Sequence, residues 1–171
     1  MILMALTMAQ GPTTAAQTQG RARLTTALEA LPVKARADRP QMVAAIDTAA
    51  RAHRVDAVWL LAVSFVESRH NVAIVGDNGR SFGPFQMAMS AARAVNKKAR
   101  KRALHRWPTA ADMAARLWRK LFDKYGPKVA PVVYNCGPVR CKQKSGKQRR
   151  STPATRGYWK YYRAMIRRIE E

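Results

Sequence analysis

Acidic residues are scarce in this chain of 171 residues, which holds 10 Asp and Glu against 32 Lys and Arg. The net charge of +22 indicates a polyanionic partner, and charge alone leaves nucleic acid, anionic lipid and acidic wall polymers open. Long apolar runs are also missing, which excludes a membrane-embedded fold, because a spanning helix needs about 18 to 20 apolar residues. The length and the apolar fraction of 47% fit one domain with a packed core.

Cysteine and histidine are nearly as rare. The two cysteines, Cys136 and Cys141, lack further Cys or His nearby, so a small disulfide loop and two free thiols both remain open, and a zinc site is disfavoured. The three histidines show no metal-ligand spacing and no glycine-rich phosphate loop is present, so we expect no cofactor. Residues 1–9 have the apolar core of an export signal without its positive charge, and they form either a weak signal or an unstructured apolar end.

Helical patterns cover most of the chain. Small polar residues predict a disordered lead-in over 1–20, and turn residues with three Gly predict a loop or small β-ribbon over 69–85. Thr109 and Asp112 form a near capping box for one of the helices. Helices are predicted over 21–31, from Pro40, from Asp56 to Ser68, and over 88–104, 109–125, 128–135 and 155–170. The sequence thus predicts a mainly α domain over 21–138, and over 139–171 a basic loop with a C-terminal helix packed on it.

Glu67 ends the most hydrophobic segment, LLAVSFVES, although acids are rare. On the predicted helix it shares a stripe with Val63 and Leu60. Burial and the partly negative C-terminal end of a helix both disfavour its charge and raise its pKa. A carboxyl group that stays protonated near neutral pH can act as the general acid on a glycosidic bond. The alternative is an exposed glutamate, or one paired with an arginine such as Arg69.

Three motifs in chain order, FVESRHN, GRSFGPFQM and VVYNCGP, resemble the signatures of the soluble-type lytic transglycosylases, relatives of goose-type lysozyme. The resemblance covers roughly residues 40–138 and implies a lysozyme-like helical domain with a loop or ribbon lining a cleft. It implies that Glu67 is the catalytic acid and base and that Tyr134 places its hydroxyl near it. The substrate-binding positions that it implies are Ser68, Ser81, Gly83, Gln86, Met87 and Asn135. Taken singly, these residues also fit structural roles, such as a core position for Met87 or a turn at Asn135.

The implied reaction cleaves the β-1,4 bond between N-acetylmuramic acid and N-acetylglucosamine of peptidoglycan and leaves a 1,6-anhydromuramoyl end. It needs one carboxylic acid, because the muramoyl 2-acetamido group stabilises the positive centre and the 6-hydroxyl attacks it. Hydrolysis by a lysozyme-like muramidase is the runner-up, with Asp77 as the candidate second acid. A turn before Asn78 and Gly79 is the simpler role for Asp77.

Two basic runs, residues 93–106 and 140–150, contain no acid. Besides forming solvated faces, they can attract anionic wall polymers. In a competing class of function they bind nucleic acid and the last predicted helix offers stacking surfaces from Tyr158, Trp159, Tyr161 and Tyr162. The helical spacing of these aromatics favours a core helix instead, so nucleic acid is disfavoured. A third class is a structural part of a phage tail or secretion apparatus. We expect an extracytoplasmic location, in the periplasm, the cell wall or a phage virion.

Overall fold

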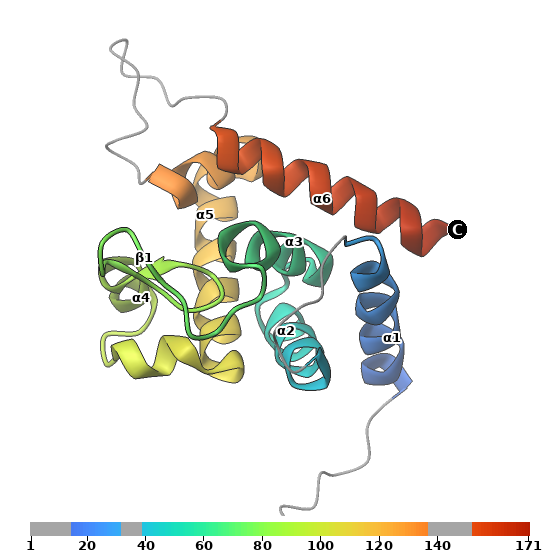
Figure 1. Ribbon diagram of the computed structural model, residues 1–171, viewed down its shortest axis with the longest axis horizontal. Helices are drawn as coiled ribbons and strands as arrows, with labels where there is room; N and C mark the ends of the chain where they lie inside the picture. Colours follow the sequence, from blue (N-terminus) through green and yellow to red (C-terminus); the bar gives the residue numbers. More distant parts are fainter. Residues whose placement is uncertain (1–14, 32–38, 137–151) are drawn as a thin grey trace, which may run out of the picture.

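The computed structural model describes residues 15–31, 39–136 and 152–171 (Figure 1). These residues form mainly helices, as predicted, and a small antiparallel sheet with the strand order β1-β2-β3. The helices are α1 (Ala15–Glu29), α2 (Arg39–His53), α3 (Ala57–Ser68), α4 (Met89–Val95), the 3-10 helix η1 (Lys101–His105), α5 (Trp107–Cys136) and α6 (Pro153–Glu170). The strands are β1 (Val75–Gly76), β2 (Ser81–Phe82) and β3 (Met87–Ala88). None of the described helices combines the length and apolar character of a membrane span.

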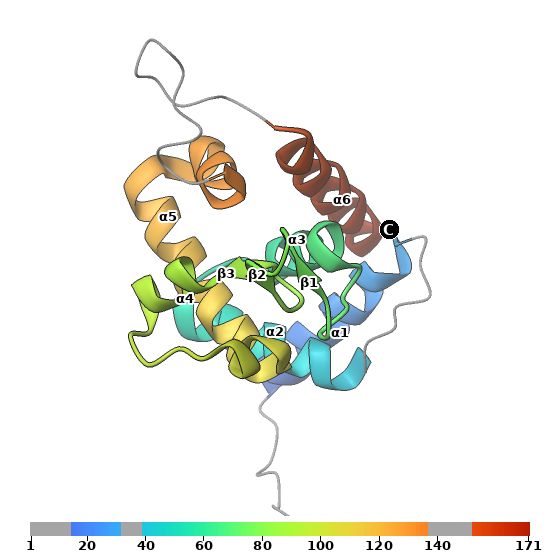
Figure 2. The same ribbon diagram turned by 60° about the vertical axis from the view of Figure 1, so that its left-hand side comes forward.

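Helix α3 lies at the centre of the molecule, between α2, α5 and α6 (Figures 1 and 2). The predicted cap is present, because the Asp56 side chain accepts a hydrogen bond from the Val58 amide at 2.9 Å. Every residue from Val58 to Phe65 is buried, which is characteristic of a helix surrounded by other elements. The helix ends where Arg69 adopts a left-handed φ of 55°, and Glu67 therefore lies in the last turn.

The predicted ribbon follows α3 and has three short strands. Phe82 pairs with Val75 on one side and with Met87 on the other. The ribbon is fastened to η1 at Gly83, which has a φ of +70°, and a Cβ at this position would overlap the carbonyl oxygen of Leu104. Only glycine allows this approach, so the ribbon and η1 form one unit.

Helix α5 changes direction at Gly126, whose φ of 72° and ψ of 167° are not helical. The short helix predicted over 128–135 is therefore the second segment of α5, which begins with Pro127. The bend allows this segment to pack its Tyr134 ring on Trp118 of the first segment, with ring centroids 4.5 Å apart. The kink thus brings the third sequence motif back to the core.

The predicted N-terminal boundary was wrong. Helix α1 begins at Ala15, so residues 15–20 belong to a helix and not to a disordered lead-in, while residues 1–14 lie outside the described residues. Gly20 suggested flexibility in the sequence, but it is a contact point, because a Cβ there would overlap the Asp47 carboxylate of α2. Leu24 and Leu28 of α1 are buried and hold the helix on the core.

Two further boundaries differ from the prediction. The helix predicted over 88–104 ends at Val95, because the Asn96 side chain accepts from the Lys98 amide at 3.0 Å and ends the helical run. The next helix starts at Trp107 instead of Thr109. Asp112 was expected to cap this helix, but its Oδ1 is hydrogen-bonded to His53 Nε2 of α2 at 2.6 Å.

Helix α6 packs across α3 and α1 (Figure 2). Most of its ring contacts are with α3, where the centroids of Trp159 and Tyr162 lie 4.7 and 5.6 Å from that of Trp59. The Tyr161 ring packs on Phe65 at 4.6 Å. These aromatic side chains are therefore occupied by the core and do not form an open stacking surface.

Candidate active site

Glu67 is the acid at the end of α3, and its carboxyl group is largely buried. Burial raises its pKa, a hydrogen bond from the Tyr158 hydroxyl to Oε1 lowers it, and the charge of Asp77 raises it further, to about 7 in total. Among the described residues no Lys or Arg pairs with Glu67, and the Arg69 guanidinium lies over the Phe65 ring, 4.3 Å from its centroid. The carboxyl group is thus both a proton donor and an acceptor near neutral pH.

Tyr158 is the site neighbour that sequence reasoning missed. It is fully buried on α6, with its ring edge-on to Trp59 at 6.1 Å and to Trp118 at 6.4 Å. Burial and the negative charge of Glu67 raise its pKa well above the ordinary value, so its hydroxyl keeps its proton and donates a hydrogen bond to the carboxylate. The available signal was the helical spacing of Tyr158 and Met165, both buried, which placed Tyr158 on the inner face of the last helix.

Tyr134 lies near Glu67 without bonding to it. Its hydroxyl donates to the Phe85 carbonyl at 2.7 Å, in the turn between β2 and β3. Burial is the largest cause that raises the pKa of Tyr134, and the charge of Glu67 raises it further. The phenol therefore lies within electrostatic reach of the acid. The hydroxyl that is hydrogen-bonded to the Glu67 carboxyl group is that of Tyr158.

Ser68 ties α3 to the ribbon. Its buried hydroxyl lies 2.8 Å from the Pro84 carbonyl and 3.0 Å from the Ser64 carbonyl, and it accepts from the Asn71 amide at 3.1 Å. Together with the Tyr134 bond, this fixes the turn at Pro84 and Phe85 beside the acid. Ser68 is therefore hydrogen-bonded to the turn that forms one wall of the site.

The turn from Gly83 to Gln86 is the part of the ribbon that forms this wall. Gln86 adopts a left-handed φ of 44°, and its Nε2 donates to the Gly83 carbonyl at 3.0 Å. The amide is thus used to hold its own turn. Ser81 is buried and donates to the Asp77 carboxylate, and Met87 is buried beneath the turn. The side chains of Ser81 and Met87, both predicted to bind substrate, are therefore buried within this wall.

Asn135, predicted to bind substrate with a simple turn as the alternative, lies in the last turn of helix α5. Its Oδ1 accepts from the Thr152 hydroxyl at 3.0 Å, which joins α5 to the cap of α6. The side chain also bonds the Tyr158 hydroxyl, an interaction that lowers the pKa of that tyrosine. Glu67, Tyr134, Asn135 and Tyr158 therefore form one group, named here the acid cluster.

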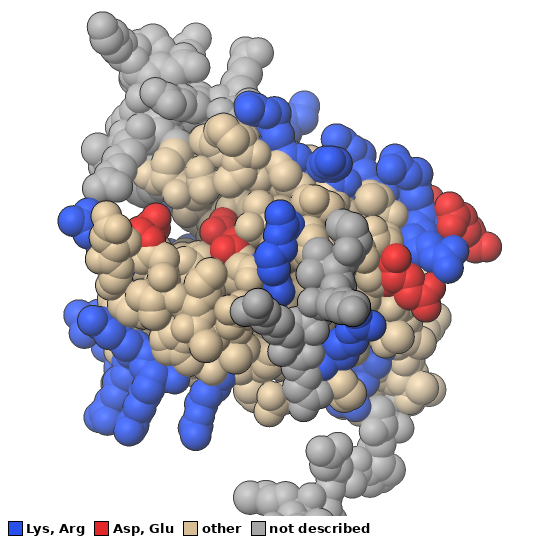
Figure 3. Space-filling model, viewed as in Figure 1, with Lys and Arg blue, Asp and Glu red and all other residues tan. Residues whose placement is uncertain are grey.

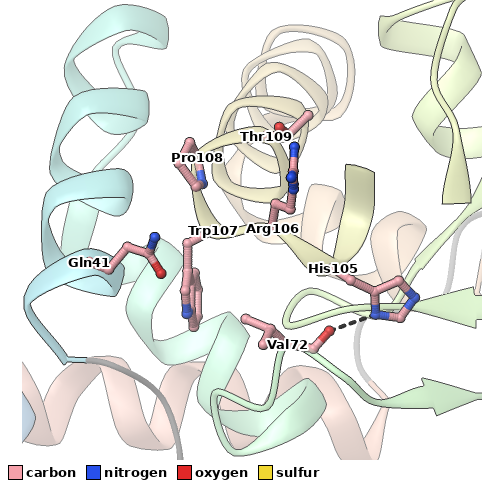
Figure 4. Close-up of a pocket in the computed structure, with 7 residues that line it drawn as sticks. All are labelled: Gln41, Val72, His105, Arg106, Trp107, Pro108 and Thr109. Carbon is pink, nitrogen blue, oxygen red and sulfur yellow. Dashed lines mark hydrogen bonds between the residues drawn. The ribbon is translucent and has the colours of Figure 1, made fainter. Parts of the chain in front are cut away.

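Two hollows of about 460 Å³ each lie apart from the acid cluster. One is shown in Figure 4, where the His105 ring bonds the Val72 carbonyl at 2.6 Å. It is lined by Gln41, Val72, His105, Arg106, Trp107, Pro108 and Thr109. The other lies between α1, α2 and the start of α3. Neither contains a member of the acid cluster, so the chemistry of Glu67 identifies the site better than these hollows do.

The histidines and cysteines are not members of the acid cluster. His70 is buried with its Nδ1 3.0 Å from the Ser64 hydroxyl, and burial lowers its pKa to about 3. In the described part of the chain, no group of three or more His, Cys, Asp or Glu is placed to hold a metal ion. Cys136 is disulfide-bonded, and Cys141 lies outside the described residues.

Residues 44–156 match the family model of the transglycosylase SLT domain. No curated protein and no solved structure matches the chain. The matched range contains all three motifs and extends from α2 into the first turn of α6. Because it covers more than half of the sequence, the chain belongs to the transglycosylase SLT domain family, with the lysozyme-like fold and the peptidoglycan-directed function of the lytic transglycosylase type that this domain supports.

Proposed function

We propose that this protein cleaves the β-1,4 bond between N-acetylmuramic acid and N-acetylglucosamine and leaves a 1,6-anhydromuramoyl end, with Glu67 as both acid and base. The observation that carries the proposal is the position of the largely buried Glu67 carboxyl group at the end of α3, where the Tyr158 hydroxyl donates to it and burial raises its pKa to about 7. A single group of this pKa is protonated often enough to donate and ionised often enough to accept. One-acid chemistry requires this property.

In the first step the protonated Glu67 donates to the glycosidic oxygen, and the bond from that oxygen to C1 breaks. The 2-acetamido group of the muramoyl residue stabilises the positive centre at C1. In the second step the Glu67 carboxylate takes the proton of the 6-hydroxyl, whose oxygen attacks C1 and closes the anhydro ring. The Tyr158 hydroxyl favours the carboxylate that exists between the two steps, because its hydrogen bond lowers the pKa.

Tyr134 and Ser68 act as positioning residues in this proposal. Both bond carbonyl groups of the same turn, at Phe85 and Pro84, and so hold one wall of the site against α3. Helix α6 supplies Tyr158, and the hydroxyl of its cap residue Thr152 donates to Asn135, so we place α6 within the catalytic domain.

Hydrolysis is the second candidate, and the position of Asp77 is the observation that favours it. Its charge raises the pKa of Glu67, so the two carboxyl groups interact, and the Ser81 hydroxyl fixes the Asp77 carboxylate. Asp77 is exposed and open to water. In this version Asp77 accepts the proton of a water that attacks C1 while Glu67 protonates the leaving oxygen.

Mass spectrometry of the muropeptides released from purified peptidoglycan separates the two chemistries. We expect products with 1,6-anhydromuramic acid from the wild-type protein and from Asp77→Asn, and none from Glu67→Gln. Reducing ends that disappear in Asp77→Asn would assign a muramidase. No release by any form of the protein would contradict both and favour a structural or binding role.

The substrate lies outside the cytoplasm, so we propose that the protein acts in the periplasm, in the wall or from a virion. Association with a phage tail or secretion apparatus stays a prediction, and finding the protein only in host periplasm and never in virions would contradict the phage version. A nucleic-acid role is not supported, because the aromatic residues of α6 pack on Trp59 and Phe65.

A further inference from the structure

The segment from α4 to the start of α5 carries a concentrated positive charge. We name its seven exposed cations the basic face: Arg93, Lys97, Lys98, Arg100, Lys101, Arg102 and Arg106. In the described part of the chain none of them forms an ion pair, and the acids of the adjacent α5 are paired elsewhere, Asp112 with His53 and Asp123 with Arg119. Figure 3 shows Lys and Arg gathered on this side, at the lower left, with no acidic side chain among them.

The backbone beneath the basic face is firmly held. Ala92, Ala99 and Leu104 are buried, and the Leu104 carbonyl packs against Gly83 of the ribbon. His105 Nδ1 bonds the Val72 carbonyl at 2.6 Å. The seven charges are therefore presented by a fixed surface, and their mutual repulsion is relieved only by anions from outside the segment.

We propose that the basic face binds a phosphodiester-linked anionic polymer attached to peptidoglycan. Charge complementarity supports a polymer of phosphate groups, because Lys and Arg are strong donors to phosphate oxygens. The face carries no exposed aromatic residue on which a nucleobase could stack. Val75, in β1, is the exposed large apolar residue of the described chain, so the face has no exposed large apolar side chain to insert into a lipid surface.

The position of the basic face beside the ribbon indicates what polymer binding does for the enzyme. Lys101 lies over the Phe82 ring of β2, 5.1 Å from its centroid, so the basic face adjoins the ribbon that walls the acid cluster. A polymer held here brings its attached glycan strand beside that wall. The inference goes beyond the proposed reaction, since binding needs no proton transfer by Glu67.

The test is co-sedimentation of the full chain, carrying Glu67→Gln so that walls are not degraded, with purified walls bearing poly(ribitol phosphate). The same walls stripped of the polymer by hydrofluoric acid are the second arm. Lys98, Arg100 and Arg102 are changed to Gln in one variant, and the exposed Lys160, Arg163 and Arg167 of α6 in a control with the same loss of charge. Lys101 is left in place so that its contact with Phe82 persists.

We expect the first variant to bind intact walls about tenfold more weakly at low salt and the α6 control to bind within about twofold of the parent. Stripped walls should bind all three proteins weakly. Equal losses in both variants would show that net charge alone attracts the wall, and equal binding to stripped walls would show that phosphate is not recognised; either overturns the proposal. A variant that loses affinity for a DNA oligonucleotide while keeping its affinity for walls would also overturn the proposal.

Two further measurements separate this proposal from the proposed reaction. Matching circular dichroism melting curves establish that the variants fold. On polymer-free peptidoglycan, the three basic-face substitutions introduced into the protein with Glu67 intact should leave the release of muropeptides unchanged. A loss of release there would place these cations in the cleft and contradict the proposed polymer site.

Discussion

The Tyr158 hydroxyl donates a hydrogen bond to Glu67 Oε1, and the two residues are 91 positions apart in the chain. This contact joins α6 to the C-terminal end of α3. It opposes the effect of burial, because a donor to the carboxylate lowers the pKa that desolvation raises. The acidity of Glu67 therefore depends on the docking of α6.

Removing this donor should alter the pH dependence of the reaction. In Tyr158→Phe the pKa of Glu67 rises above its value of about 7, so the loss of activity at high pH, where the acid form disappears, moves to higher pH. The maximal rate falls, because the carboxylate formed in the first step loses its donor. The measurement is a pH–rate profile of muropeptide release.

Tyr162→Phe is the matched control for this change. Its hydroxyl, on the same helix, donates to Asp56 Oδ2 at 2.7 Å, far along α3 from Glu67. Its profile should coincide with that of the wild type. If both variants gave the wild-type profile, Tyr158 would have no role in setting the acidity of Glu67.

Glu67→Gln should stabilise the protein at the expense of activity. Below about pH 4.5 the carboxyl group is protonated in the folded and unfolded chains, and the substitution has no electrostatic effect. Between 4.5 and about 7 only the unfolded chain ionises, so the stability of the wild type falls as pH rises. The penalty that Gln removes is about 3 kcal/mol above pH 7.

Urea unfolding at pH 4 and pH 8 checks this expectation. The gain in the free energy of unfolding should be present at pH 8 and absent at pH 4. Glu170→Gln, at an exposed position of α6, is the control and should show no such difference. A gain of the same size at both pH values would mean that packing, and not charge, is the cause.

Asp77→Asn should shift the pH profile in the opposite direction from Tyr158→Phe. Losing the negative charge lowers the pKa of Glu67, and the fall in activity at high pH moves to lower pH. Asparagine keeps an oxygen that accepts from the Ser81 hydroxyl, so the ribbon is preserved. An unchanged profile in a folded variant would show that the two carboxyl groups do not interact.

Gly83→Ala tests the junction of the ribbon and η1. The new Cβ overlaps the Leu104 carbonyl oxygen, and the residue has a left-handed φ, so we expect a loss of about 3 kcal/mol or more in the free energy of unfolding. Gly79→Ala is the matched control, since its φ is +84° and nothing lies within 4 Å of its Cβ. That change should cost about 1 kcal/mol. Equal losses in urea unfolding would argue against the contact with Leu104.

Local patterns predicted much of this structure. The acidic cap at Asp56, the apolar run that follows it and the turn residues at Asp77 and Gly79 are short-range signals, and the corresponding helix and ribbon are present. The boundaries that failed depended on distant contacts. Gly20 ends the small polar stretch that predicted disorder, but it packs against the Asp47 carboxylate, and Asp112 is hydrogen-bonded to His53, which is 59 positions away.

The site was predicted in part for the same reason. Glu67 was predicted because it ends the apolar run of its own helix, but the residue that is hydrogen-bonded to it lies on another helix, and no local pattern indicates such a pairing. The motif around Tyr134 suggested proximity to the acid, whereas its hydroxyl bonds the Phe85 carbonyl. The sequence spacing indicated that Tyr158 faces inward, but only the packing of α6 on α3 identifies what it faces.

The contact between residues 67 and 158 also bears on timing during synthesis. On the ribosome, α3 is complete about ninety residues before the tyrosine that completes its acid group emerges. A nascent chain therefore carries Glu67 without its donor, and the acid cluster is complete only when α6 docks on α3. In the proposed enzyme, full wall-cutting capacity is thus withheld from unfinished chains.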